Sequence, residues 1–323
     1  MSLDRAAAFV KKYDNFLITA HTNPEGDALG SELAFWHLLK KLKKNAFILN
    51  EDDIPGPYAF LPGLEAVRRY KKNMRGLKFD CFAVLDCSDL HRTGEVYRIA
   101  GRGKRSLNID HHISNRSFAD VNWVDAKASS CSEMVYRLYR KLKVPFCRRS
   151  ALCLYTGMVT DTGSFKYTNT TAATHRAVAD LMQFGIDAAA VYRAVYENLP
   201  YRDVKFLSSL FPLIRRDKGG RVIWFALERR LLKGQPLTID LTEHILSFAR
   251  AVKGVEVVAL FKENPGAENE IRVNLRSQGC VDVNRIAQSV GGGGHRTASG
   301  ATVKGPLAQV RRRVLKRIRE ELP

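Results

Sequence analysis

Short apolar runs alternate with helical patterns through the first half of the chain, and this alternation limits the fold more than any other feature. The predicted strands cover residues 16–20, 46–50, 79–86 and 106–110. The predicted helices cover residues 27–43, 151–160 and 174–184, and a capping box at Ser130–Glu133 opens another. Strands that alternate with helices indicate βαβ units. We therefore predict an α/β fold with a mostly parallel sheet and helices on both faces.

The second half predicts a smaller α/β domain behind a helical connector. Its strands are expected at residues 222–227, 255–261 and 271–275, and its helices at 241–249 and 282–289. A hairpin turn is expected over residues 263–270. We predict a first domain at residues 1–185, a helical linker at 186–213 and a second domain at 214–323. The cleft between two such domains is the expected place for a ligand.

Charge points to anionic ligands. The 323 residues carry 52 basic and 33 acidic side chains, a formal net charge of +19, and such an excess attracts polyanions. The arginines between Arg311 and Arg319 fall on a predicted amphipathic helix, where they form either a solvated face or a nucleic-acid groove, and the first is favoured.

Membrane and secretory classes are not expected. No apolar run reaches the roughly eighteen residues of a membrane-spanning helix, and the first residues lack a secretory signal pattern. The six cysteines form no CxxC pair, which predicts reduced thiols and a cytoplasmic protein.

Four segments are each interpreted as an apolar strand that ends in a residue able to bind metal. His21, Glu25 and Asp27 follow the first run, and Asp86 follows another. Two further segments are Asp110-His111-His112 and Asp161. Carboxylates mixed with imidazoles suit manganese, cobalt or magnesium better than a thiolate zinc site. Two ions that share a bridging carboxylate can activate water and stabilise charge on a phosphoryl group.

Each segment also has a structural explanation. His21 could be a core histidine, Asp27 could cap its own helix, and Asp86 could begin a capping sequence before a helix over residues 93–100. Three adjacent polar side chains at Asp110–His112 are costly to bury unless they are paired or metal-bound. Four such segments in one sheet favour a two-ion centre over four separate structural roles.

A glycine run, residues 291–294, is followed by His295 and Arg296. Consecutive glycines allow close approach of the backbone and can turn amides toward an anion. The alternative is a helix C-terminus closed by glycine. Arg276 and Ser277, at the end of a predicted strand, form a second candidate for phosphate binding. We favour anion binding over the alternative.

These motifs together resemble the DHH phosphoesterase superfamily with a DHHA1 domain, in the bacterial nanoRNase and pAp-phosphatase branch related to RecJ. The similarity extends from about residue 15 to residue 303. Asp110-His111-His112 matches the motif that names the superfamily, and the segment from Gly291 to His295 matches the glycine-histidine signature of the second domain.

The resemblance implies a role for each of these side chains. His21, Glu25 and Asp86 would hold one divalent ion, most simply Mn²⁺ with Mg²⁺ or Co²⁺ as alternatives. Asp27, Asp86, His111 and Asp161 would hold the other. The catalytic residues would be Asp86, Asp110 and His112, with His112 facing the scissile phosphate. The substrate-binding residues would be Arg92, Arg276, Ser277, Gly292, Gly293, Gly294, His295 and Arg296.

One residue departs from the family pattern. Glu25 stands where the family usually has aspartate, and its extra methylene places the carboxylate about one bond further from the backbone. We expect the first metal site to be weaker or altered.

The expected function is a two-metal phosphoesterase that acts on short RNA or DNA oligonucleotides or on the 3′,5′-bisphosphate nucleotide pAp. A phosphodiesterase for pApA or cyclic di-AMP is the nearest alternative, and the glycine-histidine segment argues against an inorganic pyrophosphatase. A catalytically silent nucleic-acid-binding module is the alternative from a different class. No membrane partner is expected, and a homodimer is left open.

Overall fold

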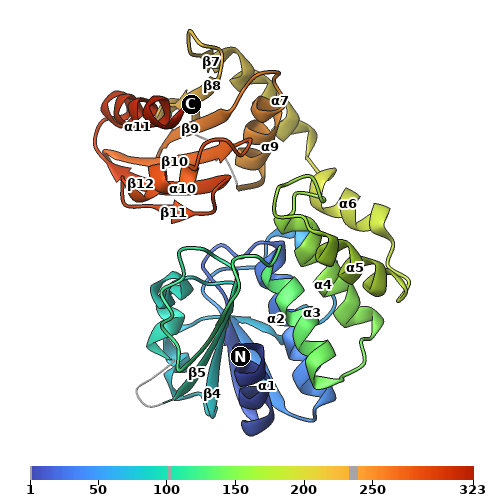
Figure 1. Cartoon of the computed structure of the whole chain (residues 1–323). Helices are drawn as coiled ribbons and strands as arrows, with labels where there is room; N and C mark the ends of the chain where they lie inside the picture. The colour runs from blue at the N-terminus through green and yellow to red at the C-terminus, as the bar shows by residue number, and fades with distance from the viewer. Residues whose placement is uncertain (1, 100–103, 233–238) are drawn as a thin grey trace. The chain divides into compact units, whose positions relative to one another are not determined.

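The structure is a computed structural model that describes residues 2–99, 104–232 and 239–323. The chain divides into two compact units, Met1–Asn198 and Leu199–Pro323 (Figure 1). The division falls inside the predicted connector, 186–213, so helices of that segment belong to both units. The three predicted domain boundaries stay predictions.

The first unit is built on a six-stranded sheet in the order β3-β2-β1-β4-β5-β6, in which every neighbouring pair is parallel. Its strands are β1 (Asn15–Thr19), β2 (Asn45–Asn50), β3 (Val67–Arg69), β4 (Cys81–Leu85), β5 (Arg105–Asp110) and β6 (Val121–Val124). The order reverses direction between β1 and β4. At such a switch point the connections leave toward opposite sides, which opens a crevice at the carboxyl ends of the strands.

The two faces of this sheet are covered differently. Phe16 and Ile18 of β1 pack into a large cluster with the α-helices, whereas Leu17 packs with Phe79 and Val96 on the other face. The α-helices are α1 (Ser2–Lys12), α2 (Gly26–Lys41), α3 (Cys131–Leu142), α4 (Arg148–Asp161), α5 (Ala172–Met182) and α6 (Ala188–Tyr196). Short 3₁₀ segments complete the unit: η1 (Gly56–Tyr58), η2 (Leu64–Ala66), η3 (Lys72–Gly76) and η4 (Leu90–Arg98). The helix predicted at 93–100 corresponds to part of η4, and its last residue lies outside the described residues.

The second unit has a mixed sheet in the order β11-β12-β10-β9-β8-β7, in which only β8 and β9 pair in parallel. The strands are β7 (Arg215–Arg216), β8 (Val222–Leu227), β9 (Val257–Glu263), β10 (Glu270–Ser277), β11 (Gly293–Gly294) and β12 (Ala298–Lys304). The helical segments are α7 (Tyr201–Leu210), η5 (Phe211–Leu213), α8 (Arg229–Leu232), α9 (Ile239–Arg250), α10 (Val283–Gln288) and α11 (Leu307–Glu321).

The second sheet is also packed on both faces. One face forms a cluster with α10 and α11, and the other with α7 and α9; Figure 1 shows α9 and α11 on opposite sides of the strands. The predicted hairpin joins β9 to β10, where the Asn264 amide donates to the Glu270 carbonyl at 2.8 Å. The predicted α/β fold class is confirmed.

One local prediction was wrong, and another is confirmed only in part. Asp161 does not follow a strand but is the last residue of helix α4. The capping box at Ser130 is only half formed: Ser130 accepts from the Glu133 amide at 3.0 Å, but the Glu133 carboxylate accepts from Ser129 and Thr174. The Glu133 carboxylate thus accepts three hydrogen bonds, two from Ser129 and one from Thr174. These bonds outweigh the single bond that a complete capping box would give it.

Among the helices of the described ranges, none combines the length and the apolar character that crossing a bilayer requires.

Helix α4 approaches both α2 and α3 closely because glycines lie at the contacts. A Cβ atom at Gly30 would lie 2.5 Å from the Cys153 carbonyl oxygen, and one at Gly157 would lie 1.9 Å from Ser132 Oγ of α3. A side chain at Gly30 would displace the backbone of α4, and one at Gly157 would displace the Ser132 side chain. This close crossing sets the distance between the first turn of α2 and the first turn of α3.

We predict that Gly30→Ala lowers the free energy of unfolding by about 1–3 kcal/mol, the cost of overpacking. The measurement is urea unfolding followed by circular dichroism. Gly56→Ala is the matched control, because nothing lies within 4 Å of a Cβ at Gly56, and its effect should stay within about 0.5 kcal/mol. Equal stability of the two variants would contradict the close-crossing argument.

Candidate metal centre

Three neighbouring strands of the first sheet end at the candidate centre. His21 comes two residues after β1, Asp86 directly after β4, and His111 directly after β5. Because β4 lies between β1 and β5, Asp86 is flanked by both histidines. The parallel order thus brings together residues that are far apart in sequence, at the switch point where α/β sheets bind ligands.

The two oxygens of Asp86 face different imidazoles. Oδ2 lies 3.5 Å from His21 Nε2, and Oδ1 lies 3.3 Å from His111 Nε2. The backbone of Asp86 is in the left-handed region (φ 52°), and its amide donates to the Ile109 carbonyl at 3.0 Å. His21 Nδ1 donates to the Thr22 carbonyl at 2.7 Å, so Nε2 carries the lone pair of the neutral ring. This geometry suits a carboxylate that bridges two cations.

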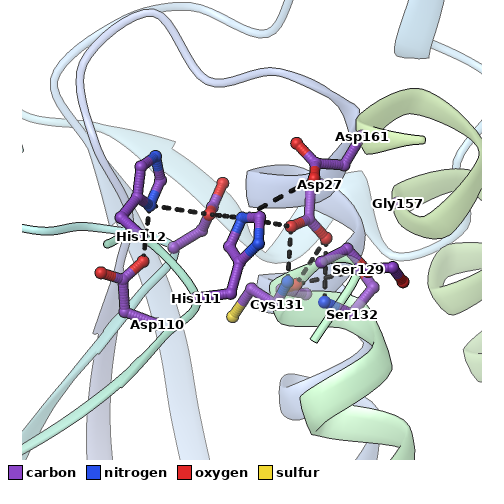
Figure 2. Close-up of polar contacts among 12 residues, drawn as sticks. Asp27, Asp110, His111, His112, Ser129, Cys131, Ser132, Gly157 and Asp161 are labelled. Carbon is purple, nitrogen blue, oxygen red and sulfur yellow. Dashed lines mark hydrogen bonds and ion pairs between the residues drawn. The ribbon is translucent and has the colours of Figure 1, made fainter. Parts of the chain in front are cut away.

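Asp27, in the first turn of α2, caps the start of a different helix. Its carboxylate accepts from the amides of Cys131 at 2.6 Å and Ser132 at 2.9 Å, the first residues of α3. The partial positive charge of a helix N-terminus stabilises such an anion. Figure 2 shows Asp27 between these amides and His111, close to Gly157. The alternative that Asp27 caps its own helix is therefore not what the structure shows.

His111 lies among three carboxylates. Its Nε2 is 3.3 Å from Asp86 Oδ1, 3.7 Å from Asp27 Oδ2 and 3.8 Å from Asp161 Oδ2. Ligand atoms of Asp27, Asp86 and His111 all lie within 4.8 Å of one another. Asp86 Oδ1 is buried and makes no hydrogen bond within the described residues. A buried polar atom without a hydrogen bond is costly, and a divalent cation would give Asp86 Oδ1 a ligand bond.

The pKa values of the buried acids also reflect the crowding of carboxylates at this position. Burial and the Asp86 carboxylate raise the pKa of Asp27 to about 7. Burial also raises the pKa of Asp161 well above its usual value, although His111 opposes that shift. Burial alone would raise the pKa of Asp86, but the neighbouring imidazoles of His111 and His21 hold it well below the usual range. Such a set of oxygen and imidazole donors fits hard or borderline divalent ions.

Asp110 and His112 form a separate pair beside Asp86. Asp110 is fully buried; its Oδ1 accepts from His112 Nδ1 at 2.7 Å, and its Oδ2 accepts from Asn115 Nδ2 at 2.6 Å. His112 Nδ1 is also 3.7 Å from Asp86 Oδ1. Asp110 thus fixes the orientation of the His112 ring through Nδ1, so that Nε2 is the nitrogen that can act on a substrate oxygen.

Asn169 is a residue of the site that the sequence did not indicate. Its Nδ2 donates to Asp161 Oδ2 at 3.1 Å, to the Asp161 carbonyl at 3.1 Å and to the Ser129 carbonyl at 2.8 Å. It therefore ties the end of α4 to the segment before α3. An asparagine in a loop carries no sequence signal of such a role, because the three acceptor atoms belong to residues eight and forty positions away.

Glu25 and Arg92 lie at the edge of this cluster. Glu25 is the exposed N-cap residue of α2, without a side-chain cap, and its charge raises the pKa of Asp161, with burial as the larger cause. Neither buried acid–imidazole set among the described residues of this unit includes Glu25. Arg92 is exposed, and its carbonyl accepts from the Thr22 amide at 2.7 Å. The segment that carries Arg92 is thus held beside His21.

The glycine run of the second unit closes helix α10. Gly291 is left-handed (φ 83°); its amide donates to the Gln288 carbonyl at 3.1 Å, and the Gly292 amide donates to the Ala287 carbonyl at 2.8 Å. These two bonds form a Schellman cap. The amides of Gly291 and Gly292 therefore do not point toward an anion as expected, and the alternative of a glycine-closed helix describes this part of the run.

The remaining glycines allow β11 to pair closely with β12. A Cβ at Gly294 (φ 143°) would lie 2.6 Å from the Ala298 carbonyl oxygen. The next residues form a tight turn, in which the His295 amide donates to the Ala298 carbonyl at 2.7 Å. The side chain of His295 is half-buried and that of Arg296 is exposed. Both side chains therefore project from a rigid turn.

Arg276 and Ser277 have structural partners. The Arg276 guanidinium forms a two-point ion pair with the Glu243 carboxylate of α9, and its Nη1 donates to the Leu275 carbonyl at 3.0 Å. Ser277 is buried, and its Oγ accepts from the Gly279 amide at 2.9 Å. A phosphate at Arg276 would have to share the guanidinium with Glu243.

Comparison with known proteins agrees with this arrangement. The family model "DHH family, N-terminal domain" matches residues 15–158, and the model "DHHA1 domain" matches residues 240–322. The chain is 31% identical over 302 residues to the "Probable bifunctional oligoribonuclease and PAP phosphatase NrnA" of Streptococcus mutans, with 91% of each chain covered. It is 31% identical over 311 residues to the "Bifunctional oligoribonuclease and PAP phosphatase NrnA" of Thermus thermophilus, with 94% of this chain and 89% of that protein covered.

A solved structure has the same fold along nearly the whole chain. The crystal structure of an exopolyphosphatase-related protein from Bacteroides fragilis superposes with a TM-score of 0.87 at 26% identity, and covers 98% of this chain and 96% of its own.

We predict that Asn169→Ala weakens Mn²⁺ binding by about 10- to 100-fold, the usual effect of removing a hydrogen bond that orients a ligand. The measurement is isothermal titration calorimetry of the metal-free protein. Thr170→Val is the matched control, because Thr170 Oγ1 is buried without a hydrogen-bond partner. Unchanged Mn²⁺ affinity in Asn169→Ala would show that Asp161 does not need this contact.

Proposed function

This chain belongs to the DHH family and carries a DHHA1 domain, and we propose that it is a divalent-metal-dependent phosphoesterase of short oligoribonucleotides and pAp. The relatives from Streptococcus mutans and Thermus thermophilus, which it resembles over most of its length, are named for both activities. Those names support the two substrate classes, and the buried acid–imidazole cluster supports hydrolysis at a phosphate.

The observation that carries the proposal is the position of Asp86 between two histidines, 3.5 Å from His21 and 3.3 Å from His111. We assign His21, Glu25 and Asp86 to one ion. Asp27, Asp86, His111 and Asp161 are assigned to the second. When bound, two such ions lower the pKa of a water and neutralise charge that develops on a phosphoryl group. The protein supplies the fixed carboxylates and excludes bulk water from Asp27 and Asp86, which are almost fully buried.

His112 is proposed to act on the substrate. With Nδ1 held by Asp110 at 2.7 Å, its Nε2 can donate to a phosphoryl oxygen or give a proton to the leaving oxygen. Asp110 stabilises the charged ring in that role. Arg92, exposed on the segment next to His21, is proposed as a further phosphate contact.

In the second unit, we propose that His295 and Arg296 contact the nucleotide. The turn that carries them is rigid, and the His295 imidazole and the Arg296 guanidinium can both donate hydrogen bonds. Both features support this role. Gly292, Gly293 and Gly294 are proposed to contribute because, without side chains, they let β11 pack closely on β12 and let a ligand approach the backbone. Arg276 and Ser277 are proposed to contribute from the end of β10. Manganese is the proposed ion, and the cytoplasm is the proposed compartment because all six cysteines are free thiols.

The test is turnover by metal-stripped protein with Mn²⁺ restored. The substrates offered side by side are pAp, 5′-phosphorylated short RNAs, pApA, cyclic di-AMP and pyrophosphate. We expect Mn²⁺-dependent release of phosphate from pAp and of mononucleotides from the RNAs. Faster cleavage of pApA or cyclic di-AMP would favour the alternative phosphodiesterase, and no turnover despite bound Mn²⁺ would favour a silent binding module.

Asp86→Asn is the matched variant for this experiment. Asparagine tolerates the left-handed backbone of Asp86 (φ 52°), so the fold should persist while one negative charge between the two sites is lost. We expect binding of both ions to fall and the rate on pAp to drop by at least about 10³-fold, on the order of 4 kcal/mol of barrier. Activity close to that of the wild type would overturn the bridging assignment.

Glu25→Asp tests the departure from the family pattern. Shortening the side chain by one methylene should tighten Mn²⁺ binding at the first site by up to about tenfold, equivalent to ~1.4 kcal/mol. Glu25→Gln, which keeps the length and removes the charge, should weaken it. Calorimetry and the rate with Mn²⁺, Mg²⁺ and Co²⁺ measure both effects. If metal affinity, metal preference and rate were all unchanged in both variants, Glu25 would not be a ligand.

A further inference from the structure

The second unit contains a basic cavity that the proposed function does not use. It has a volume of about 380 Å³ and lies between the β7–β8 hairpin and helix α11. The lining residues are Arg215, Trp224, Ala308, Arg311, Arg312, Leu315 and Arg319. Arg215 and Trp224 are opposite each other in the β7–β8 pairing, so their side chains leave the same face of the sheet. The helix contributes one stripe of residues spaced three or four apart.

Four arginines line this cavity, and no carboxylate does. Within the described residues, the basic side chains of α11 that form ion pairs are Lys316 and Arg317, which both reach Glu320. Arg311, Arg312 and Arg319 take part in no ion pair among the same residues. Like charges gathered without a counter-charge repel one another, and an anion in the cavity would relieve this repulsion.

On the hairpin side of the cavity, the side chain of Arg215 is held in a fixed direction. Arg215 Nη1 donates to the carbonyls of Pro212 at 3.0 Å and Ile214 at 2.9 Å, which fixes the direction of its guanidinium. Leu315 is 5% exposed, and Trp224 is partly buried against the core cluster beneath α11. Leu315 and Trp224 therefore form an apolar floor, and the arginines form a positively charged rim around it.

The length of the stripe selects an extended anion. Arg311 and Arg319 are eight residues apart, about 12 Å along the helix axis, so one phosphate would contact both only if the two side chains bent toward each other. A chain of phosphates could follow the stripe. Trp224 adds an aromatic surface on which a base can stack, and arginines interleaved with an aromatic residue are typical of sites for single-stranded nucleic acid.

The second unit as a whole has the charge that such binding needs. Residues 199–323 contain 23 basic and 12 acidic residues, a formal net charge of +11 out of the +19 of the chain. Single-stranded RNA approaching this unit would be attracted before any specific contact forms.

We propose that this cavity is a binding site for single-stranded RNA, in which Arg215, Arg311, Arg312 and Arg319 contact successive phosphates and Trp224 stacks on a base. The site is separate from the residues assigned above to metal and nucleotide, and it does not depend on hydrolysis. The arginines of α11 are then a nucleic-acid surface, which is the alternative that the sequence alone did not favour.

The test is binding of a fluorescein-labelled oligouridylate of about twelve nucleotides by the full chain in EDTA, measured by fluorescence anisotropy over a range of salt. The variant Arg311→Gln/Arg312→Gln/Arg319→Gln should raise Kd by at least about tenfold. It should also reduce the slope of log K against log salt by about 2, because each phosphate contact on a single strand contributes ~0.7.

The matched control is Arg313→Gln/Lys316→Gln/Arg317→Gln, which removes the same charge from the same helix outside the cavity lining. We expect its Kd to stay within about threefold of the wild type. Equal weakening by the two triple variants would overturn the proposal, because binding would then depend on overall charge alone.

The fluorescence of Trp224 distinguishes RNA from other polyanions. RNA should quench the tryptophan emission of the wild type, and this quenching should be lost in Trp224→Phe, while Trp36 and Trp123 remain as internal references. Inorganic polyphosphate of similar charge should compete only weakly for the site. Equal competition by polyphosphate, together with unchanged quenching in Trp224→Phe, would identify an inorganic polyanion site and overturn the assignment to RNA.

Discussion

The first unit must bury several carboxylates in one place, and most of its polar architecture compensates for that. Asp27 is held by the amides that begin α3, Asp110 by His112 and Asn115, and Asp161 by Asn169. Each carboxylate thus receives hydrogen bonds from a rigid element. What stays uncompensated is the meeting point itself, where Asp86 Oδ1 makes no hydrogen bond within the described residues. A cation at this point would give the buried oxygen a partner.

The sheet order and the close helix crossing place these compensating groups. The order of the strands puts β4 between β1 and β5, so Asp86 is reached by a histidine from either side. The glycines of α2 and α4 bring the start of α3 close enough to α2 for its amides to bind Asp27. A fold with the same strands but a wider crossing would take the Cys131 and Ser132 amides away from Asp27 and leave it only the Ser31 hydroxyl, at 3.2 Å, as a donor. Stability and the metal centre therefore depend on the same contacts.

The second unit shows how one sequence pattern can have two physical causes. Its glycine run suggested an anion nest, but Gly291 and Gly292 are required by the Schellman cap and Gly294 by the contact between β11 and β12. The arginines of α11 showed the reverse. They suggested a solvated face, yet three of them line a cavity with Trp224. In both cases the decisive facts were contacts between segments distant in sequence.

The sequence by itself determined the α/β class, the bounds of β8 within one residue, and the residue types of a metal centre, because periodicity, strand-end residues and the Asp110-His111-His112 motif are local. It did not determine the short strand β3, whose residues are mostly exposed, nor the seven-residue strand β12, which is rich in small residues, nor that Asp161 ends helix α4 and not a strand. Only the tertiary structure decided that Asp27 caps α3, that Asn169 holds Asp161 and that Arg276 pairs with Glu243. Each of these depends on where two distant backbones meet, and hydrogen bonds over such separations leave no pattern in a single sequence.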